Sequence, residues 1–156
     1  ITFDVIQDTD LETTTIGFSS SDTTVGYLFS AENYDMDLIR STWDFDGNGH
    51  ADALTDGMLM MRYCFGFRGE SLIEDATSPE STLNHQEVEQ KILDAMYIAD
   101  IDDDGEVKAL TDSLILIRYL FGIYGYDLID QAIAPDASRT SHSAIEEHLL
   151  KHMPQM

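Results

Sequence analysis

Apolar residues recur at helical spacing in two stretches of the chain, each preceded by an acidic segment. In the second stretch, steps of four, three and four residues place one apolar stripe on one helix face, formed by Leu110, Leu114, Ile117 and Phe121. The first stretch has the same spacing, with Leu54, Met58, Met61 and Phe65. Each stretch therefore predicts a helix whose stripe faces the core.

A further helix is predicted between these stretches. Asn84 is followed three residues later by Glu87, which is the pattern of a capping box. An apolar face follows this start, formed by Val88, Ile92, Leu93 and Met96. The C-terminal tail has a similar face, formed by Ile145, Leu149, Leu150 and Met153. Residues 44–156 are thus expected to be helical.

Residues 1–43 have a different pattern. Ile1, Phe3 and Val5 alternate with polar residues, and apolar residues recur in 14–18 and 24–29 around possible turns. Two or three β-strands are the expected result. Such a short sheet cannot bury a core alone, so it must pack on the helices, on a neighbouring domain or on another copy of the chain. We predict a mainly α protein with a short N-terminal β segment.

The helical region contains an internal duplication. Residues 44–79 and 100–135 are identical at 16 of 36 aligned positions, which chance does not produce. The predicted domain of residues 44–156 therefore consists of two repeats, residues 44–99 and 100–156.

Each repeat opens with an acidic loop whose spacing suits a hard cation. Ca²⁺ takes six to eight oxygen ligands at about 2.3–2.6 Å, and a short loop supplies them by pointing alternate side chains inward. Positions 1, 3 and 5 carry oxygen donors in both loops: Asp44, Asp46 and Asn48, then Asp100, Asp102 and Asp104. Position 6 is glycine, where the backbone must turn sharply, and position 7 offers a main-chain carbonyl from His50 or Glu106.

The later loop positions differ from a 12-residue EF-hand loop. At position 9, Asp52 can ligate directly or through water, whereas Lys108 has no side-chain oxygen, so water is expected there and the two sites should not be equivalent. Threonine stands at position 12 in both loops and becomes a candidate N-cap. The expected closing ligands, one residue later, are Asp56 and Asp112.

An acidic turn with a glycine is by itself often only a solvated turn. Two matched copies, each followed by an apolar helix, favour metal sites instead. We therefore predict two Ca²⁺ sites, because mixed carboxylate, amide and carbonyl donors in flexible loops favour Ca²⁺ over Mg²⁺.

The units DFDGNGHADALTDGMLMMRYCFG and DIDDDGEVKALTDSLILIRYLFG resemble the paired calcium-binding repeats of type I dockerin domains and of dockerin-like modules in secreted bacterial proteins. The resemblance covers about residue 44 to the C-terminus. It implies a small helical module with two EF-hand-like loops that folds around Ca²⁺ and binds a protein partner.

Two departures from the dockerin pattern concern the partner. The family places its recognition hydroxyls just after position 9, where this chain has Ala53 and Leu54, and Ala109 and Leu110. This argues against binding a cohesin of the cellulosomal kind. Each repeat is also longer, with a second apolar stretch at 71–76 and 127–132. Modules from bacteria without cellulosomes are therefore the closer resemblance.

Composition narrows the possible partners and compartment. A formal net charge of −22 with eight Lys and Arg argues against nucleic acid and anionic membranes. No apolar stretch is long enough to span a membrane. The single cysteine, Cys64, corresponds to Leu120 of the second repeat, which favours buried packing over redox chemistry. Secretion or a cell-surface location is expected because calcium is available there.

Two further features have both functional and structural interpretations. Arg62 and Arg118 occupy the same place in otherwise apolar helices, and hydrogen bonding to carbonyls or loop carboxylates is favoured over partner recognition. His148 and His152 are four residues apart on the terminal helix and can hold a transition metal, but near a chain end we expect them to face solvent.

No nucleophile and base pair, phosphate loop or cofactor fingerprint is present, so an enzyme is not expected. The leading hypothesis is a calcium-binding, dockerin-like interaction module of a secreted bacterial protein, in which Ca²⁺ shapes a surface for a protein partner. The alternative is a structural subunit of a calcium-stabilised extracellular assembly that uses the N-terminal β segment for self-association.

Overall fold

The computed structural model describes residues 13–16, 34–37 and 42–154, and the chain divides into two compact units, Ile1–Arg40 and Ser41–Met156. In the first unit, strands β1 (Thr13–Ile16) and β2 (Tyr34–Asp37) pair antiparallel, with Thr13 opposite Asp37. The strands predicted within residues 1–5 and 24–29 lie outside the described residues.

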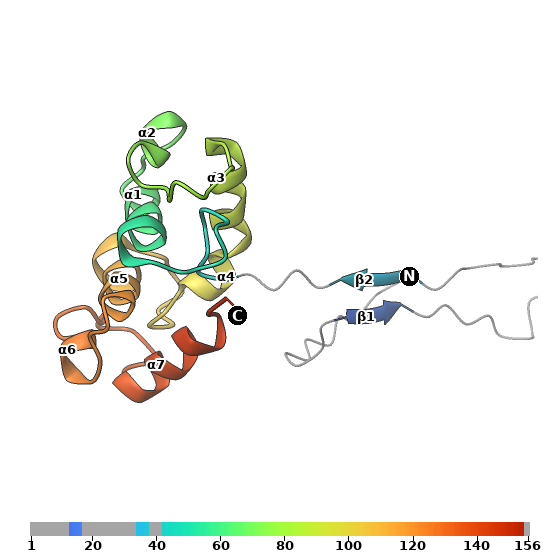
Figure 1. Cartoon of the computed structure of the whole chain (residues 1–156). Helices are drawn as coiled ribbons and strands as arrows, with labels where there is room; N and C mark the ends of the chain where they lie inside the picture. The colour runs from blue at the N-terminus through green and yellow to red at the C-terminus, as the bar shows by residue number, and fades with distance from the viewer. Residues whose placement is uncertain (1–12, 17–33, 38–41, 155–156) are drawn as a thin grey trace, which may run out of the picture. The chain divides into compact units, whose positions relative to one another are not determined.

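The second unit is helical, which confirms the mainly α prediction (Figure 1). Its first half contains η1 (Ala53–Gly57), α1 (Met58–Cys64), α2 (Glu70–Ile73), α3 (His85–Asp94) and α4 (Met96–Ala99). Its second half contains η2 (Ala109–Ser113), α5 (Leu114–Leu120), α6 (Tyr126–Ile129) and α7 (His142–Lys151). Within the described part of the chain, no helix combines the length and hydropathy that a membrane crossing requires.

The elements η1, α1 and α2 have counterparts 56 residues later in η2, α5 and α6. The two halves pack crosswise, because η1 contacts α5 and η2 contacts α1. At one crossing, a Cβ added to Gly57 would lie 2.9 Å from Cγ1 of Ile117, so the close approach requires glycine. At the other crossing, the hydroxyl of Ser113 lies 3.2 Å from the sulfur of Cys64. Cys64 was predicted to be buried, and it is half-buried.

The predicted apolar stripes of α1 and α5 were wrong, because none of their eight residues is buried. The buried residues of these helices are Leu59 and Met60, and Ile115 and Leu116. Four residues of the predicted stripes are instead more than half exposed: Leu54, Phe65, Leu110 and Phe121.

Two local features explain this difference. The turns η1 and η2 are π-helical, with Gly57 N–H bonding to the carbonyl of Asp52 and Ser113 N–H to that of Lys108. Because a π turn inserts an extra residue, a 3.6-residue period does not continue through it. The helices also end at Cys64 and Leu120, so each phenylalanine follows its helix rather than lying within it.

The start of α3 confirms the predicted capping box. The side-chain oxygen of Asn84 accepts hydrogen bonds from the N–H groups of Gln86 and Glu87, at 2.9 and 3.2 Å. The Glu87 carboxylate accepts from the Asn84 N–H at 2.8 Å. Val88 and Ile92 then face the core, whereas Leu93 is about half exposed.

The arginines of α1 and α5 have the structural role that the sequence favoured. Nη1 of Arg62 donates to the carbonyls of Leu72 and Glu74, at 3.1 and 2.6 Å. Nη1 of Arg118 makes the corresponding bonds to the carbonyls of Leu128 and Asp130, at 3.1 and 2.8 Å. Each guanidinium thus satisfies the C-terminal carbonyls of a four-residue helix that is too short to stand alone.

We expect Arg62→Met to lower the free energy of unfolding by about 1 to 2 kcal/mol, because two carbonyls lose a charged donor at a partly exposed site. Calcium affinity should not change, since Arg62 bonds to neither loop. Chemical denaturation followed by circular dichroism measures the loss. Lys151→Met is the control, because the Lys151 side chain is exposed and donates to no carbonyl of the described residues.

Trp43 packs into the helical unit. Its side chain is completely buried, and its indole Nε1 donates to the carbonyl of Leu149 at 2.8 Å. The main-chain N–H of Trp43 donates to the carbonyl of His152 at 3.1 Å. Its ring makes edge contacts with Phe45, His148 and His152. By its contacts Trp43 belongs with residues 44–154, although the predicted boundary lies after it.

The expectation that His148 faces solvent was wrong. Its Nε2 lies 2.7 Å from the carbonyl of Ile98, and burial lowers the pKa of its imidazole. The neutral ring donates its Nε2 proton to that carbonyl, so the nitrogen has no free lone pair for a transition metal. His148 instead links α7 to the segment just before the second acidic loop.

Candidate metal centres

Three aspartates converge in loop 1 (residues 44–56). One carboxylate oxygen from each of Asp44, Asp46 and Asp56 lies within 4.8 Å of the others. Two oxygens bound to one Ca²⁺ are at most about 5 Å apart, twice the usual bond length. This trio therefore has the spacing of oxygens that share an ion. Asp46 and Asp56 are completely buried, and Asp44 is 9% exposed.

Loop 2 (residues 100–112) contains an equivalent trio. Oxygens of Asp100, Asp102 and Asp112 also lie within 4.8 Å of one another, and the last two residues are completely buried. Six of the predicted ligands thus form two clusters that can each hold a metal ion. All six supply carboxylate oxygen, which suits hard cations.

The closing aspartates also organise the loop backbone. The Asp56 carboxylate accepts four hydrogen bonds, from Phe45 N–H (2.6 Å), Asp46 N–H (3.1 Å), Asp52 N–H (2.8 Å) and the hydroxyl of Thr55 (2.9 Å). Asp112 accepts the equivalent four, from Ile101 N–H (2.7 Å), Asp102 N–H (3.4 Å), Lys108 N–H (2.8 Å) and the hydroxyl of Thr111 (2.7 Å).

The expectation that these threonines cap the following helices was therefore wrong. Thr55 and Thr111 lie inside η1 and η2, where their hydroxyls donate to the adjacent closing aspartate. The N-cap positions are Asp52 and Lys108, neither of which makes a side-chain capping bond.

The first aspartate of each loop accepts hydrogen bonds from the main-chain N–H groups at positions 5 and 6. The N–H groups of Asn48 and Gly49 each donate to Asp44 at 3.1 Å. In loop 2, Asp104 and Gly105 donate to Asp100 at 3.1 and 2.9 Å. The two glycines have φ angles of +91° and +90°, which a side chain would strain, so glycine is required at this turn.

The third position ties each loop to a distant segment. The N–H of Ser78 donates to Asp46 at 2.7 Å, and that of Ala134 donates to Asp102 at 2.8 Å. Sequence reasoning missed both donors. The only available signal was that each precedes a proline in matching positions of the two halves, which marks a turn without identifying its partner.

One oxygen of the loop 2 trio is left without a proton donor. Oδ1 of Asp102 is buried and accepts no hydrogen bond from the described residues. Burial raises the pKa of Asp102, and the carboxylates of Asp112, Asp104 and Asp100 raise it further. A buried, unpaired carboxylate oxygen is costly unless a cation neutralises it, so this trio fits a metal ion.

The first trio also carries a cost for its negative charge. Burial raises the pKa of Asp56 to about 6, although the hydrogen bonds from the backbone of Asp52 and Asp46 and from Thr55 act to lower it. The nearby Asp46 carboxylate raises it as well. A cation within the trio would offset both the desolvation and the repulsion.

The remaining predicted ligands are not members of the trios. The side-chain oxygens of Asn48 and Asp104 each accept a hydrogen bond at 2.8 Å, from the N–H of His50 and of Glu106 respectively. Asp52, at position 9 of loop 1, is exposed. These five complete the predicted sets, but the convergence itself involves only the trios.

Lys108 occupies the place of Asp52 in loop 2. Its Nζ lies 2.6 Å from Oδ2 of Asp104 and 2.7 Å from Oε2 of Glu106. The hydrogen bond from Lys108 lowers the pKa of Asp104. A cation that belongs to the chain itself therefore already binds one predicted ligand, the Asp104 carboxylate, and also the carboxylate of Glu106, whose predicted ligand atom is its main-chain carbonyl.

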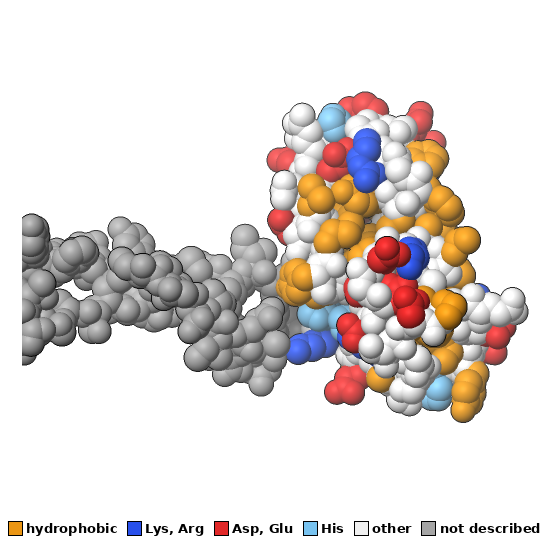
Figure 2. All heavy atoms as spheres, turned by 180° about the vertical axis from the view of Figure 1, so that it is seen from behind, with side chains coloured by type: hydrophobic (Ala, Val, Ile, Leu, Met, Phe, Trp, Pro, Cys, Tyr) orange, Lys and Arg blue, Asp and Glu red, His pale blue; other side chains and the backbone are white. Residues whose placement is uncertain are grey.

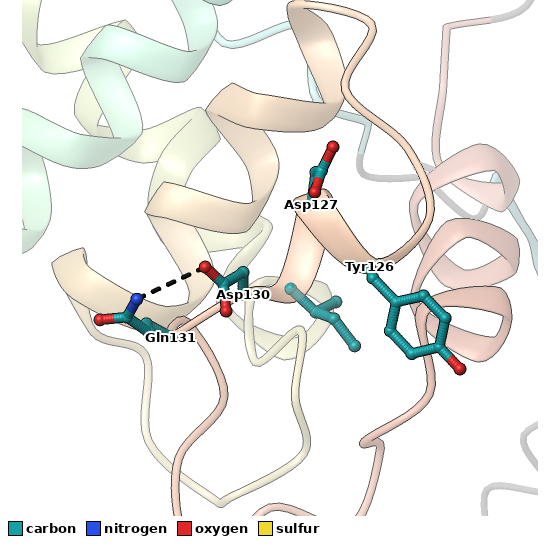
Figure 3. A pocket seen from close by; sticks show the side chains of 5 residues that line it. Tyr126, Asp127, Asp130 and Gln131 are labelled. Carbon is teal, nitrogen blue, oxygen red and sulfur yellow. Dashed lines mark hydrogen bonds between the residues drawn. The ribbon is translucent and has the colours of Figure 1, made fainter.

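Away from the loops, the surface offers a depression of about 360 Å³ beside α6 (Figure 3). It is lined by Tyr126, Asp127, Ile129, Asp130 and Gln131. Its labelled side chains spread outward rather than converge, and Gln131 bonds to Asp130 at 3.4 Å. None of the predicted ligands lines this depression, so the loops are the better candidate site.

No family model matches the chain, and neither the curated proteins nor the solved structures contain a significant match to it.

Proposed function

We propose that the protein is a calcium-binding, dockerin-like interaction module of a secreted bacterial protein. The observation that carries this proposal is the pair of aspartate trios, spaced 56 residues apart and each compact enough to surround one ion. The 16 identities shared by the two halves and the resemblance of their loops to dockerin repeats support it.

Calcium is the ion that the donors favour. Each trio is made of carboxylates, and its loop adds an amide or carboxylate at position 5 and a carbonyl at position 7. Oxygen-rich, flexible loops suit Ca²⁺, whereas Zn²⁺ and Cu²⁺ favour imidazole or thiolate ligands. Calcium is abundant outside cells, which supports a secreted or cell-surface location.

A bound ion would stabilise the fold. Asp44, Asp46 and Asp56 would hold it in loop 1, and Asp100, Asp102 and Asp112 in loop 2, where it would neutralise buried charge. The third-position aspartates also bond to Ser78 and Ala134, so each ion would fix the segment after α2 or α6. Binding free energy would then appear as folding free energy.

The partner surface that we propose lies on the exposed apolar residues of the two halves. Figure 2 shows patches of apolar side chains on one face of the helical unit. Among the exposed apolar residues are three pairs at matching positions: Leu54 and Leu110, Phe65 and Phe121, Phe67 and Ile123. Large exposed apolar side chains in groups are typical of protein contact sites, so the partner is expected to be a protein.

A calcium titration tests the proposal. Calorimetry on protein freed of metal with EDTA should show two binding events, with gains in helix content and Tm by circular dichroism. Asp44→Ala should remove one event and Asp100→Ala the other, because each side chain belongs to one trio. The exposed acids Glu147 and Asp136 provide matched controls, and their alanine variants should bind two ions.

The absence of heat and of any stabilisation at millimolar calcium would contradict the proposal. Loss of both events in each single variant would show that the loops do not bind independently. The alternative function, self-association through the N-terminal β segment, stays a prediction.

A further inference from the structure

The two loops differ most in how their outer acids are neutralised. In loop 2, Nζ of Lys108 bridges Oδ2 of Asp104 and Oε2 of Glu106, at 2.6 and 2.7 Å. At the corresponding positions loop 1 has Asn48, His50 and Asp52, which provide no ammonium group. The Asp104 side chain is completely covered, whereas that of Lys108 is 43% exposed.

A lysine at this place balances the charge of its loop. Beyond the trios, loop 1 carries one negative side chain at positions 5, 7 and 9, namely Asp52. Loop 2 carries two, Asp104 and Glu106, together with the positive Lys108. The net charge at these three positions is therefore −1 in both loops, but loop 2 reaches it with an internal cation.

We propose that Lys108 acts as a tethered competitor of calcium in loop 2. Loop 2 then binds the ion more weakly than loop 1, and Lys108 stabilises the conformation of loop 2 when no ion is bound. This inference rests on the calcium-binding function proposed above. Asp104 stands at position 5, where its carboxylate would ligate the ion. While Lys108 binds Oδ2 and the N–H of Glu106 binds Oδ1, neither oxygen is free of a donor.

The competition follows from electrostatics. An ion in the trio of Asp100, Asp102 and Asp112 would lie close to the ammonium of Lys108, because Asp104, which Lys108 binds, donates its own N–H to Asp100 of the trio at 3.1 Å. Two cations repel, so Lys108 must move away from Asp104 or lower the affinity for the ion. Without calcium, the same ammonium relieves repulsion among the carboxylates of loop 2. Loop 1 has no such counter-ion among its described contacts.

Replacing Lys108 should therefore change affinity and stability in opposite directions. Lys108→Met keeps most of the length of the side chain and removes its charge. The Kd of loop 2 should fall by about fivefold to tenfold, since charge count tunes such sites. The Tm of the metal-free protein should fall as well. The Kd of loop 1 should stay within about twofold of the original.

The two loops can be followed separately by NMR. The N–H groups of Gly49 and Gly105 donate to Asp44 and Asp100, one in each trio. Their amide resonances should respond to the ion in their own loop. A titration of the ¹⁵N-labelled full chain with CaCl₂ then yields a Kd for each loop without a disabling variant. In the original protein, Gly49 should respond at lower calcium than Gly105.

Two further variants separate charge from packing. Lys108→Arg keeps the charge and should retain the weaker affinity of loop 2, whereas Lys108→Gln should behave like Lys108→Met. Lys91→Met removes the same charge from α3, where Lys91 makes no ion pair with the described residues of either loop. It should leave both Kd values unchanged.

The outcomes distinguish this inference from the proposed function. If neither glycine responds to calcium in the original protein, the calcium-binding function itself is wrong. If both respond but Lys108→Met and Lys108→Gln leave the Kd of loop 2 unchanged or raise it, the competitor role is overturned while the function stands. Tighter binding at loop 2 with lower metal-free Tm supports it.

Discussion

Asp56→Ala is expected to lower the free energy of unfolding by about 3 to 5 kcal/mol, even without calcium. The Asp56 carboxylate is completely buried and accepts three backbone N–H groups and the hydroxyl of Thr55. Alanine leaves these buried donors unpaired, and each unpaired group costs about 1 to 3 kcal/mol, partly relieved by water.

The same substitution should also remove calcium binding at loop 1, because Asp56 belongs to its trio. The loss of stability should therefore be larger in calcium than in EDTA. The measurement is chemical denaturation in both conditions, followed by the fluorescence of Trp43, the single tryptophan of the chain. Asp112→Ala should reproduce the effect through loop 2.

Asp52→Ala is the control within the same loop. Its side chain is exposed, so its loss should change the stability of the metal-free protein by no more than about 0.5 kcal/mol. If Asp56→Ala also cost less than about 1 kcal/mol in EDTA, the hydrogen bonds to its carboxylate would not be what orders loop 1.

Trp43→Ala is the second large effect, with an expected loss of about 3 to 5 kcal/mol. The substitution removes a completely buried indole that contacts Phe45, His148 and His152, and it leaves a cavity next to Asp44. The indole also bonds to the carbonyl of Leu149 in α7. Trp43 therefore connects the start of loop 1 to the last helix.

Circular dichroism follows this variant, because the fluorescent residue is lost. Trp43→Phe separates the two contributions, since it keeps an aromatic ring and removes only the Nε1 donor and some volume. We expect it to cost about 1 to 2 kcal/mol. Equal losses for the two variants would show that the hydrogen bond to Leu149, rather than packing, dominates at this position.

Several features were predictable because they depend on neighbours in the sequence. The capping box of Asn84 and Glu87 is a contact over three residues, and it forms as predicted. The aspartates at positions 1, 3 and 13 of each loop also lie within a short segment, and they converge into the two trios. Local spacing carries this information because few backbone paths join residues so close together.

Other features could not be predicted from a regular helical period or from neighbouring residues. The π turns moved the buried faces of α1 and α5 to Leu59, Met60, Ile115 and Leu116. A periodicity argument assumes a regular helix, so it cannot detect a turn that bends the backbone to bring Asp56 or Asp112 into a loop. Likewise, nothing near His148 in the sequence indicates that the carbonyl of Ile98 lies beside it.

The sequence by itself determined the helical class, the acidic loop positions and the similarity of the two halves, because these are properties of composition and short-range spacing. Only the tertiary structure decided the long-range contacts of the loops and of the residue that precedes loop 1. These contacts are Trp43 against α7, and Ser78 and Ala134 against the third-position aspartates. These contacts join residues more than 30 positions apart. Their formation depends on how the two halves pack, which no local pattern encodes.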